Sequence, residues 1–295
     1  MVGLSIKKDG IYAALFSPYD DQGRLDLGQV RKMIRFEVEH GVEGLYCCGS
    51  SGEGLLLDVQ ERKDLVSVVS DEICGKIPFI VHTGSLSTKN AIELSQHAQE
   101  CGASAVSMIP PIYYHYSNEE VAQYYEDVVK SVDLGVIVYN IPQFTGISFS
   151  KNNSFLKDPR IIGIKHTSMN LYELERITQE FPNKIIFNGF DEIWLYSLCA
   201  GATATIGPTV NICPKLYVAI RNSFLSGKIL EARKLQHMAN DFIEALVSTS
   251  VFPAAKYCLT LLGVDVGSCR HPFLPLSASQ QQKVKGALKR IEAYL

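Results

Sequence analysis

The chain has 295 residues, of which 46% are hydrophobic, so it is long enough to bury a large core within one domain. Acidic and basic residues are interspersed, the formal net charge is −3, and no block of like charge indicates a surface for nucleic acid or a membrane. The first ten residues lack the apolar region of a secretion signal, and no later apolar segment is long enough to span a bilayer. We therefore expect a soluble, cytoplasmic protein that acts on a small molecule, with no nucleic-acid or membrane partner.

Eight cysteines are scattered along the chain, except for the adjacent pair Cys47 and Cys48. There is no C-x-x-C pair and no nearby pair of histidines that would complete a zinc site. We expect mostly buried free thiols and no metal site.

Short apolar runs recur about every thirty residues, and each is followed by a segment with helical periodicity. In chain order the predicted strands cover residues 11–16, 44–48, 77–82, 103–109, 135–139, 161–165, 184–187 and 202–206. Amphipathic helices are predicted between them at 27–40, 59–69, 89–101, 119–132 and 171–181, with Ser117 as a capping residue for one of them.

Eight such units favour an α/β fold in which the strands close into a (β/α)₈ TIM barrel rather than extend an open sheet. We expect the barrel to occupy residues 1–215 and to carry the active site. The pattern after it is helical to the end of the chain, so residues 216–295 are predicted to form a wholly helical C-terminal extension packed on the barrel, with an approximate boundary.

In a barrel of this kind, functional residues lie at the carboxyl ends of the strands and in the loops that follow them. Lys165 ends an apolar run at such a position. Burial disfavours the charged form of an amine, and a neutral amine attacks carbonyl groups. The alternative is a lysine that extends to the barrel rim or pairs with a carboxylate.

Two further strand ends carry polar groups. Tyr139 ends the preceding strand, where its phenol is suited to transfer protons, although a packed core tyrosine is the alternative. The loop of Gly49, Ser50, Ser51, Gly52 and Glu53 offers amide and hydroxyl donors for a substrate carboxylate. An ordinary capped turn between strand and helix would produce the same pattern.

Asp191 and Glu192 follow another strand, and two adjacent carboxylates repel phosphate but accept hydrogen bonds from sugar hydroxyls. A solvated helix start is the alternative. His82, His115 and His166 also lie near strand ends, without the carboxylate spacing of a metal site. Metal-dependent chemistry is therefore less favoured than a Schiff base on Lys165.

Together these residues resemble the N-acetylneuraminate lyase and dihydrodipicolinate synthase family of pyruvate-dependent class I aldolases. The likeness covers nearly the whole chain and is strongest in GLYCCGSSGE (44–53), VYNIP (138–142) and GIK (163–165). The resemblance implies that Ser50 and Ser51 hold the carboxylate of a 2-keto acid, that Lys165 attacks its C2 carbonyl, and that Tyr139 transfers the proton. It also implies that Tyr113 reaches into a neighbouring subunit's site, and hence a homotetramer.

Several positions distinguish the branches of this family. Dihydrodipicolinate synthases usually carry an arginine at the position of Phe144, which here cannot grip a second carboxylate. The lyase branch is matched by residues that would lie along the sugar chain, namely Thr167, Gly189, Asp191 and Glu192. That branch usually has a serine at the position of Pro208, and Thr209 offers a hydroxyl beside it.

The resemblance implies reversible cleavage of N-acetylneuraminate to N-acetylmannosamine and pyruvate through an imine, with no cofactor. Three alternatives remain at this stage. The chain could act on another 2-keto-3-deoxy sugar acid by the same mechanism, or as a dihydrodipicolinate synthase. It could also be a noncatalytic sensor of keto acids, which the presence of both Lys165 and Tyr139 disfavours.

Overall fold

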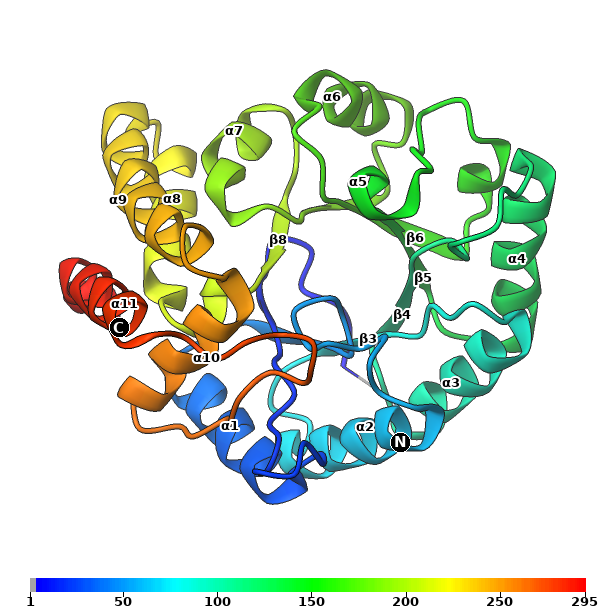
Figure 1. The fold of residues 1–295 in the computed structure, drawn as a ribbon. Helices are drawn as coiled ribbons and strands as arrows, with labels where there is room; N and C mark the ends of the chain where they lie inside the picture. The colour runs from blue at the N-terminus through cyan, green and yellow to red at the C-terminus, as the bar shows by residue number, and fades with distance from the viewer. Residues whose placement is uncertain (1–3) are drawn as a thin grey trace.

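The computed structural model describes residues 4–295 and forms a closed barrel of eight parallel strands, with β1 paired to β8 (Figure 1). Most strands are displaced along the barrel relative to the next strand, as where Tyr12, the second residue of the first strand, pairs with Gly44, the first residue of the second. The strands are β1 Ile11–Ala14, β2 Gly44–Cys47, β3 Phe79–His82, β4 Ala105–Met108, β5 Val136–Asn140, β6 Ile161–His166, β7 Ile185–Asn188 and β8 Ala204–Gly207. The predicted (β/α)₈ fold is confirmed.

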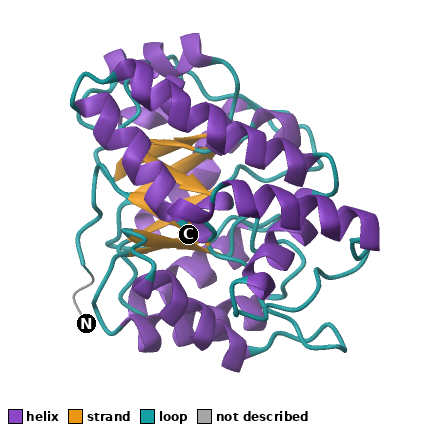
Figure 2. Cartoon of the chain, turned by 90° about the vertical axis from the view of Figure 1, so that its left-hand side faces the viewer, coloured by secondary structure: helices purple, strands orange, loops and turns teal. Residues whose placement is uncertain are grey.

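Helices surround the strands, which lie at the centre of the molecule in Figure 2. They are α1 Leu27–Glu39, α2 Val59–Ile73, α3 Thr88–Glu100, α4 Asn118–Ser131, α5 Pro142–Thr145, α6 Leu171–Glu180, α7 Trp194–Cys199 and α8 Pro214–Leu225, with 3₁₀ turns η1 Ser154–Lys157, η2 Asp191–Ile193 and η3 Thr209–Asn211. Ser117 caps α4 as predicted, because its side chain accepts a hydrogen bond from the Glu120 amide while the Glu120 side chain bonds back to the Ser117 amide.

The barrel has two separate cores, because alternate residues of each strand point inward and outward. The inner core contains large side chains such as Tyr12, Tyr46 and Phe187. The rings of Tyr12 and Phe187 meet edge to face at 5.6 Å between centroids. These side chains fill the barrel, so a substrate has room only at its mouth.

The C-terminal helices α9 Ile229–Val247, α10 Val251–Leu261 and α11 Ala278–Arg290 gather on one side of the barrel next to α8 (Figure 1), and the chain ends with η4 Glu292–Tyr294. Their apolar faces join the core between the barrel and its helices, which includes Leu246, Leu259 and Leu288. The division of the chain at residue 216 stays a prediction.

The prediction that residues 216–295 are wholly helical is wrong for residues 262–277, which lie between α10 and α11. This segment contains two glycines and two prolines, which disfavour a helix. It returns to the barrel, where Val264 and Val266 are buried and the Tyr19 amide donates to the Val266 carbonyl at 3.2 Å. We refer to residues 262–277 as the return segment.

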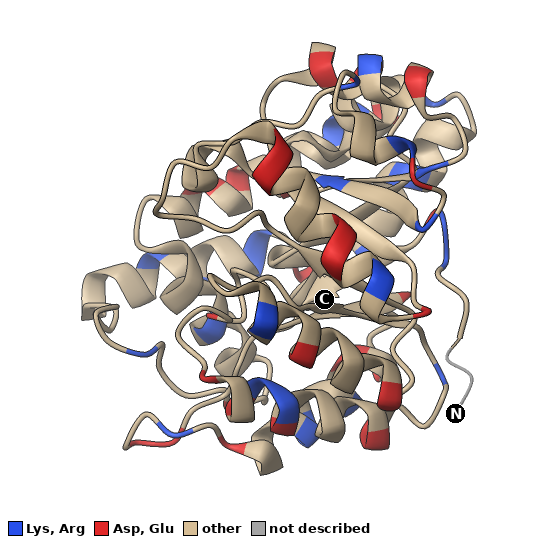
Figure 3. Cartoon of the chain, turned by 90° about the vertical axis from the view of Figure 1, so that its right-hand side faces the viewer, with Lys and Arg blue, Asp and Glu red and all other residues tan. Residues whose placement is uncertain are grey.

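On the face shown in Figure 3, acidic and basic residues are distributed over many helices and loops, with both signs present across the face. No helix within residues 4–295 is long and apolar enough to cross a membrane. All eight cysteines are free thiols; only Cys47, Cys48, Cys213 and Cys258 are buried, so the expectation that most would be buried is met by half of them.

Candidate active site

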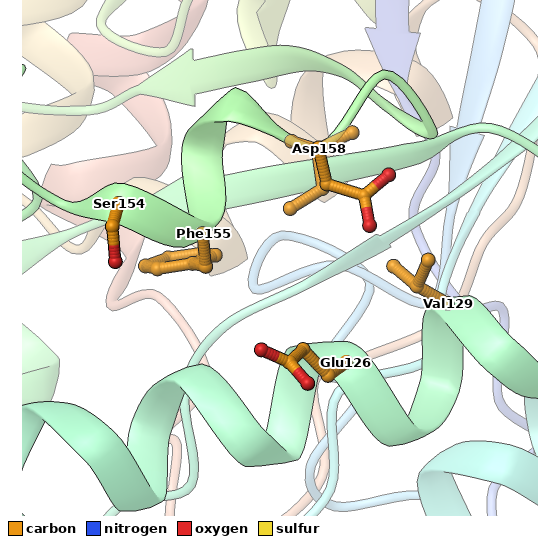
Figure 4. Close-up of a pocket in the computed structure, with 6 residues that line it drawn as sticks. Glu126, Val129, Ser154, Phe155 and Asp158 are labelled. Carbon is orange, nitrogen blue, oxygen red and sulfur yellow. The ribbon is translucent and has the colours of Figure 1, made fainter.

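A cavity of about 230 Å³ lies between α4 and η1, on the outside of the barrel. Figure 4 shows its lining, which includes Glu126, Phe155 and Asp158. Neither Lys165 nor Tyr139 lines it. The side chains predicted to carry chemistry gather instead at the carboxyl ends of the strands.

Lys165 and Tyr139 lie side by side on adjacent strands, where β6 pairs with β5 in register. The Lys165 Nζ atom is 3.8 Å from the centre of the Tyr139 ring and 4.7 Å from that of the Tyr46 ring. Only 4% of Lys165 and 2% of Tyr139 is exposed. This burial does not fit a lysine whose side chain extends to the solvent at the barrel rim. The amine lies inside the mouth of the barrel, where a bound ligand would meet it.

The phenol of Tyr139 is the acidic partner of this pair. Burial alone would raise its pKa, but the positive charge of Lys165, together with the polar contacts that Lys165 and Ser50 make with the phenol, lowers the pKa below its usual value. A phenol with a lowered pKa gives up its proton more readily. The pair can therefore supply both a nucleophile and a proton-transfer group.

The loop after β2 brings Ser50 to the mouth, with its Oγ atom 3.5 Å from the Tyr139 hydroxyl. Ser51 is buried in the same loop. The Ser17 hydroxyl anchors the loop by donating to the Gly52 carbonyl at 2.6 Å. The hydroxyl of Ser50 thus lies beside the groups that would act on the C2 carbonyl of a bound 2-keto acid.

Thr167 and Gly189 lie together at the ends of β6 and β7. A Cβ atom at Gly189 would lie 1.7 Å from the Thr167 Oγ1 atom, so only glycine fits there. The Thr167 hydroxyl is buried and has no hydrogen-bond partner within the described residues. A buried hydroxyl without a partner is costly, which favours a ligand that completes its hydrogen bonding.

Asp191 is buried at the end of β7, and one of its oxygens is held firmly. The Thr209 amide and hydroxyl donate to its Oδ2 atom at 2.8 and 2.6 Å. Its Oδ1 atom has no partner within residues 4–295 and lies where a Cβ atom at Gly207 would stand. Burial raises the pKa of Asp191 to about 6, although the hydrogen bonds from Thr209 oppose this shift. The free oxygen is suited to accept a hydrogen bond from a ligand.

A chain of hydrogen bonds that the sequence did not reveal supports Asp191. The Thr209 hydroxyl has a single hydrogen, which it donates to Asp191. The Tyr217 hydroxyl oxygen, 2.5 Å from the Thr209 hydroxyl oxygen, is therefore the donor between these two groups. The Tyr217 carbonyl accepts from the indole nitrogen of Trp194 at 3.3 Å. Gln236, on α9, donates to the Asp191 carbonyl at 3.1 Å. Only the fold brings residues so far apart in sequence together.

Two more interior side chains lie behind the site: Tyr46, to which the sequence pattern assigned no role, and His82, which it placed only near a strand end. The Tyr46 hydroxyl donates to the Ser107 Oγ atom at 3.1 Å, and the His82 ring lies 6.0 Å from that of Tyr139. Burial first, and then the charges of Arg62 and Lys165, lower the pKa of His82 well below its usual value. Tyr46 could have been identified from strand alternation, because it shares the inward parity of Gly44 in β2.

A family model described as the dihydrodipicolinate synthetase family matches residues 7–291. The chain belongs to this family. A protein of Rhizobium meliloti named N-acetylneuraminate lyase is 38% identical over 98% of this chain and 97% of its own length. A sialic acid aldolase of Ruminococcus gnavus has been solved as wild type and as a catalytic lysine mutant. Each structure is 31% identical to this chain, with a TM-score of 0.94 over 98% of this chain, and the match covers 100% of the wild-type chain and 98% of the mutant chain. A dihydrodipicolinate synthase of Bacillus anthracis, 24% identical over 96% of this chain and 98% of its own, shares the fold with a TM-score of 0.92.

The resemblance also singled out Glu192 and Tyr113, and of these only Glu192 lies with the other site residues. Glu192 is half-buried beside Asp191, and burial raises its pKa. Tyr113 is 85% exposed, has a φ angle of +86°, and packs its ring against Tyr114 rather than against Lys165. Within one chain the structure therefore gathers Lys165, Tyr139, Ser50, Thr167 and Asp191, but not Tyr113.

Proposed function

We propose that this chain is an N-acetylneuraminate lyase, which cleaves its substrate reversibly to N-acetylmannosamine and pyruvate through a Schiff base on Lys165. The observation that carries the proposal is the buried amine of Lys165, 3.8 Å from the Tyr139 ring, with the Ser50 hydroxyl beside the phenol. The relatives named N-acetylneuraminate lyase and sialic acid aldolase support the choice of substrate.

The reaction uses Lys165 as nucleophile and electron sink. Ser50 and Ser51 bind the substrate carboxylate, and the Lys165 amine adds to C2. The hydroxyl then leaves C2 as water with the proton of Tyr139, which leaves a protonated imine and a phenolate. Tyr139 takes the proton of the C4 hydroxyl as the C3–C4 bond breaks, and the electron pair of that bond neutralises the imine to give an enamine. Protonation at C3 and hydrolysis release pyruvate and restore the lysine, so no added cofactor is needed.

The sugar end of the substrate lies toward Asp191 in this proposal. The Oδ1 atom of Asp191 and the Thr167 hydroxyl, both buried and unpartnered in the described chain, form hydrogen bonds with sugar hydroxyls. Glu192 adds a second acceptor, and Gly189 leaves room for the chain of carbons. Thr209 acts through Asp191, because its hydroxyl already donates to that carboxylate.

A second candidate is an aldolase of the same mechanism for a shorter 2-keto-3-deoxy sugar acid. It is favoured by Pro208, which has no hydroxyl or amide hydrogen to offer the distal end of the substrate. Dihydrodipicolinate synthesis is less favoured, since Phe144 provides no positive charge for a second carboxylate.

We also propose that the protein is a cytoplasmic homotetramer. The exposed ring of Tyr113 supports this arrangement, because a large aromatic side chain that is 85% exposed becomes buried if a neighbouring subunit covers it.

The decisive experiment is reductive trapping. Borohydride with pyruvate should leave a stable adduct that peptide mass spectrometry places on Lys165, and Lys165→Ala should give neither adduct nor activity. An adduct on another residue would overturn the mechanism. Pyruvate release from N-acetylneuraminate and from a shorter 2-keto-3-deoxy acid, measured side by side, decides between the two substrates.

A further inference from the structure

A buried ion pair joins the C-terminal helices to the loop after β2. The Lys256 Nζ atom, on α10, lies 2.9 Å from the Glu53 Oε1 atom, and the two side chains are 2% and 1% exposed. Burial lowers the pKa of Lys256 while the charge of Glu53 opposes this shift. Removing two charges from water costs free energy, and such a pair contributes little net stability compared with apolar side chains of the same size. Its presence needs another explanation.

The pair is the centre of a junction between three segments. Lys256 also donates to the carbonyl of Ser17, in the loop after β1, at 2.7 Å and to that of Ser268, in the return segment, at 3.1 Å. The second oxygen of Glu53 accepts from the Arg270 amide at 2.8 Å. The return segment and the loops after β1 and β2 are thus fixed relative to one another by two side chains.

The junction lies at the turn that carries Ser50. Glu53 has a φ angle of +52°, which side-chain-bearing residues rarely adopt, and its amide closes the turn by donating to the Ser50 carbonyl at 3.1 Å. Interactions of the surroundings must hold such a backbone in place. Neither Glu53 nor Lys256 contacts the Lys165 amine, so their effect on the site passes through this turn.

We propose that Lys256 and Glu53 are positioning residues that hold the Ser50–Ser51 turn in the geometry that binds the substrate carboxylate. The inference rests on the proposed function and deepens it. The C-terminal extension then contributes to keto-acid binding without supplying a group that touches the substrate. A displacement of binding groups by about 1 Å is enough to cost roughly a hundredfold in an enzyme reaction.

The test measures the pyruvate concentration that gives half-maximal borohydride trapping on Lys165. In Lys256→Met and in Glu53→Gln this concentration should rise about tenfold or more, whereas the trapping rate at saturating pyruvate should stay within about threefold of wild type. Lys256→Arg, which keeps the positive charge, should bind pyruvate more tightly than Lys256→Met but less tightly than the wild type. If Lys256→Met does not fold, Glu53→Gln decides by the same measurement.

Arg221→Met is the control, because Arg221 forms a less deeply buried ion pair with Glu43 next to the amino-terminal ends of the strands. It should lower the melting temperature as Lys256→Met does but leave the half-saturating pyruvate concentration unchanged. Unaltered pyruvate affinity in Glu53→Gln, or an equal loss in the control, would overturn the positioning role. Failure of the proposed function would be distinct, since wild-type protein would then form no adduct on Lys165.

Discussion

Tyr139 owes its chemical character to its neighbours. Lys165 and Ser50 surround its phenol, and the positive charge of the lysine stabilises the phenolate that forms when the proton leaves. Proton transfer by a positioned side chain accelerates a reaction by roughly a hundredfold to ten-thousandfold. The contribution of this one hydroxyl is therefore measurable.

Tyr139→Phe should lower kcat for cleavage by roughly a hundredfold or more, while the half-saturating pyruvate concentration for trapping changes little. Tyr46→Phe is the control, because its ring also faces the Lys165 amine but its hydroxyl bonds to Ser107. It should retain most of the activity. A Tyr139→Phe variant as active as this control would reduce Tyr139 to a packing role.

Asp191 should make substrate affinity depend on pH. Burial raises its pKa to about 6, and its free oxygen accepts a sugar hydroxyl best when the carboxyl is ionised. KM for the sugar acid should therefore rise as the pH falls through about 6, by roughly tenfold if the charged hydrogen bond is lost. The rise should be absent in Asp191→Asn. A KM profile that both proteins share would assign the pH dependence to another group.

The residues that could be predicted from the sequence are those at the ends of recognisable strands. Lys165, Tyr139 and Asp191 each follow an apolar run, and the barrel rule places such positions at one mouth. Tyr217 and Gln236 could not be predicted, because they support Asp191 from helices that follow the last strand. No local pattern distinguishes such a residue from any other on an amphipathic helix.

Among the single elements, helix α1 contains a buried carboxyl group, that of Glu37. Glu37 is fully buried, neither of its carboxyl oxygens has a partner within the described residues, and burial raises its pKa well above the usual value. The folded protein holds the proton more tightly than the unfolded chain, whose glutamates titrate near pH 4.3. The stability of the fold should thus decline as the pH rises above about 4.3 toward the raised pKa.

Glu37→Leu should remove this decline and raise the free energy of unfolding by about 1–3 kcal/mol at pH 8. Glu39→Leu is the control on the exposed side of the same helix, and it should change stability by less than about 0.5 kcal/mol. Urea unfolding at pH 5 and pH 8 measures both. Equal pH dependence in wild type and Glu37→Leu would contradict the prediction.

Elements were predictable to the extent that their hydrophobic patterns are periodic. All eight strands lie within or next to the apolar runs, with ends that shift by a few residues, as for β3 at Phe79–His82 against the predicted 77–82. The return segment was not foreseen, since its two buried valines resemble part of a helical pattern. Its glycines and prolines were the signal against that interpretation.

Across the whole molecule, the repeat of strand and helix predicts the barrel but does not predict its assembly. If Tyr113 completes a neighbour's site, then each site needs two chains. Mixing inactive Lys165→Ala with inactive Tyr113→Ala should restore activity, because a mixed pair has one site with both groups intact. After full subunit exchange, about a quarter of the sites should be active.

Sedimentation should show a particle of about four chains for the wild type and both variants. A Tyr113→Ala protein that is fully active as a monomer would contradict the shared site. Mixtures that stay inactive after exchange would show that Tyr113 acts within its own chain.

The hydrogen-bonded support of Asp191 has an optical consequence. Trp194 is the only tryptophan of the chain, and its indole nitrogen donates to Tyr217, whose hydroxyl donates to Thr209 and so connects to Asp191. The emission of this indole should therefore respond to occupancy near Asp191. Addition of N-acetylmannosamine to enzyme that carries the borohydride-reduced pyruvate adduct should shift the tryptophan fluorescence. Formation of the adduct at Lys165 should by itself leave the emission spectrum nearly unchanged. Tryptophan fluorescence can then distinguish binding of the sugar half of the substrate from binding of the pyruvate half, with no label added to the protein.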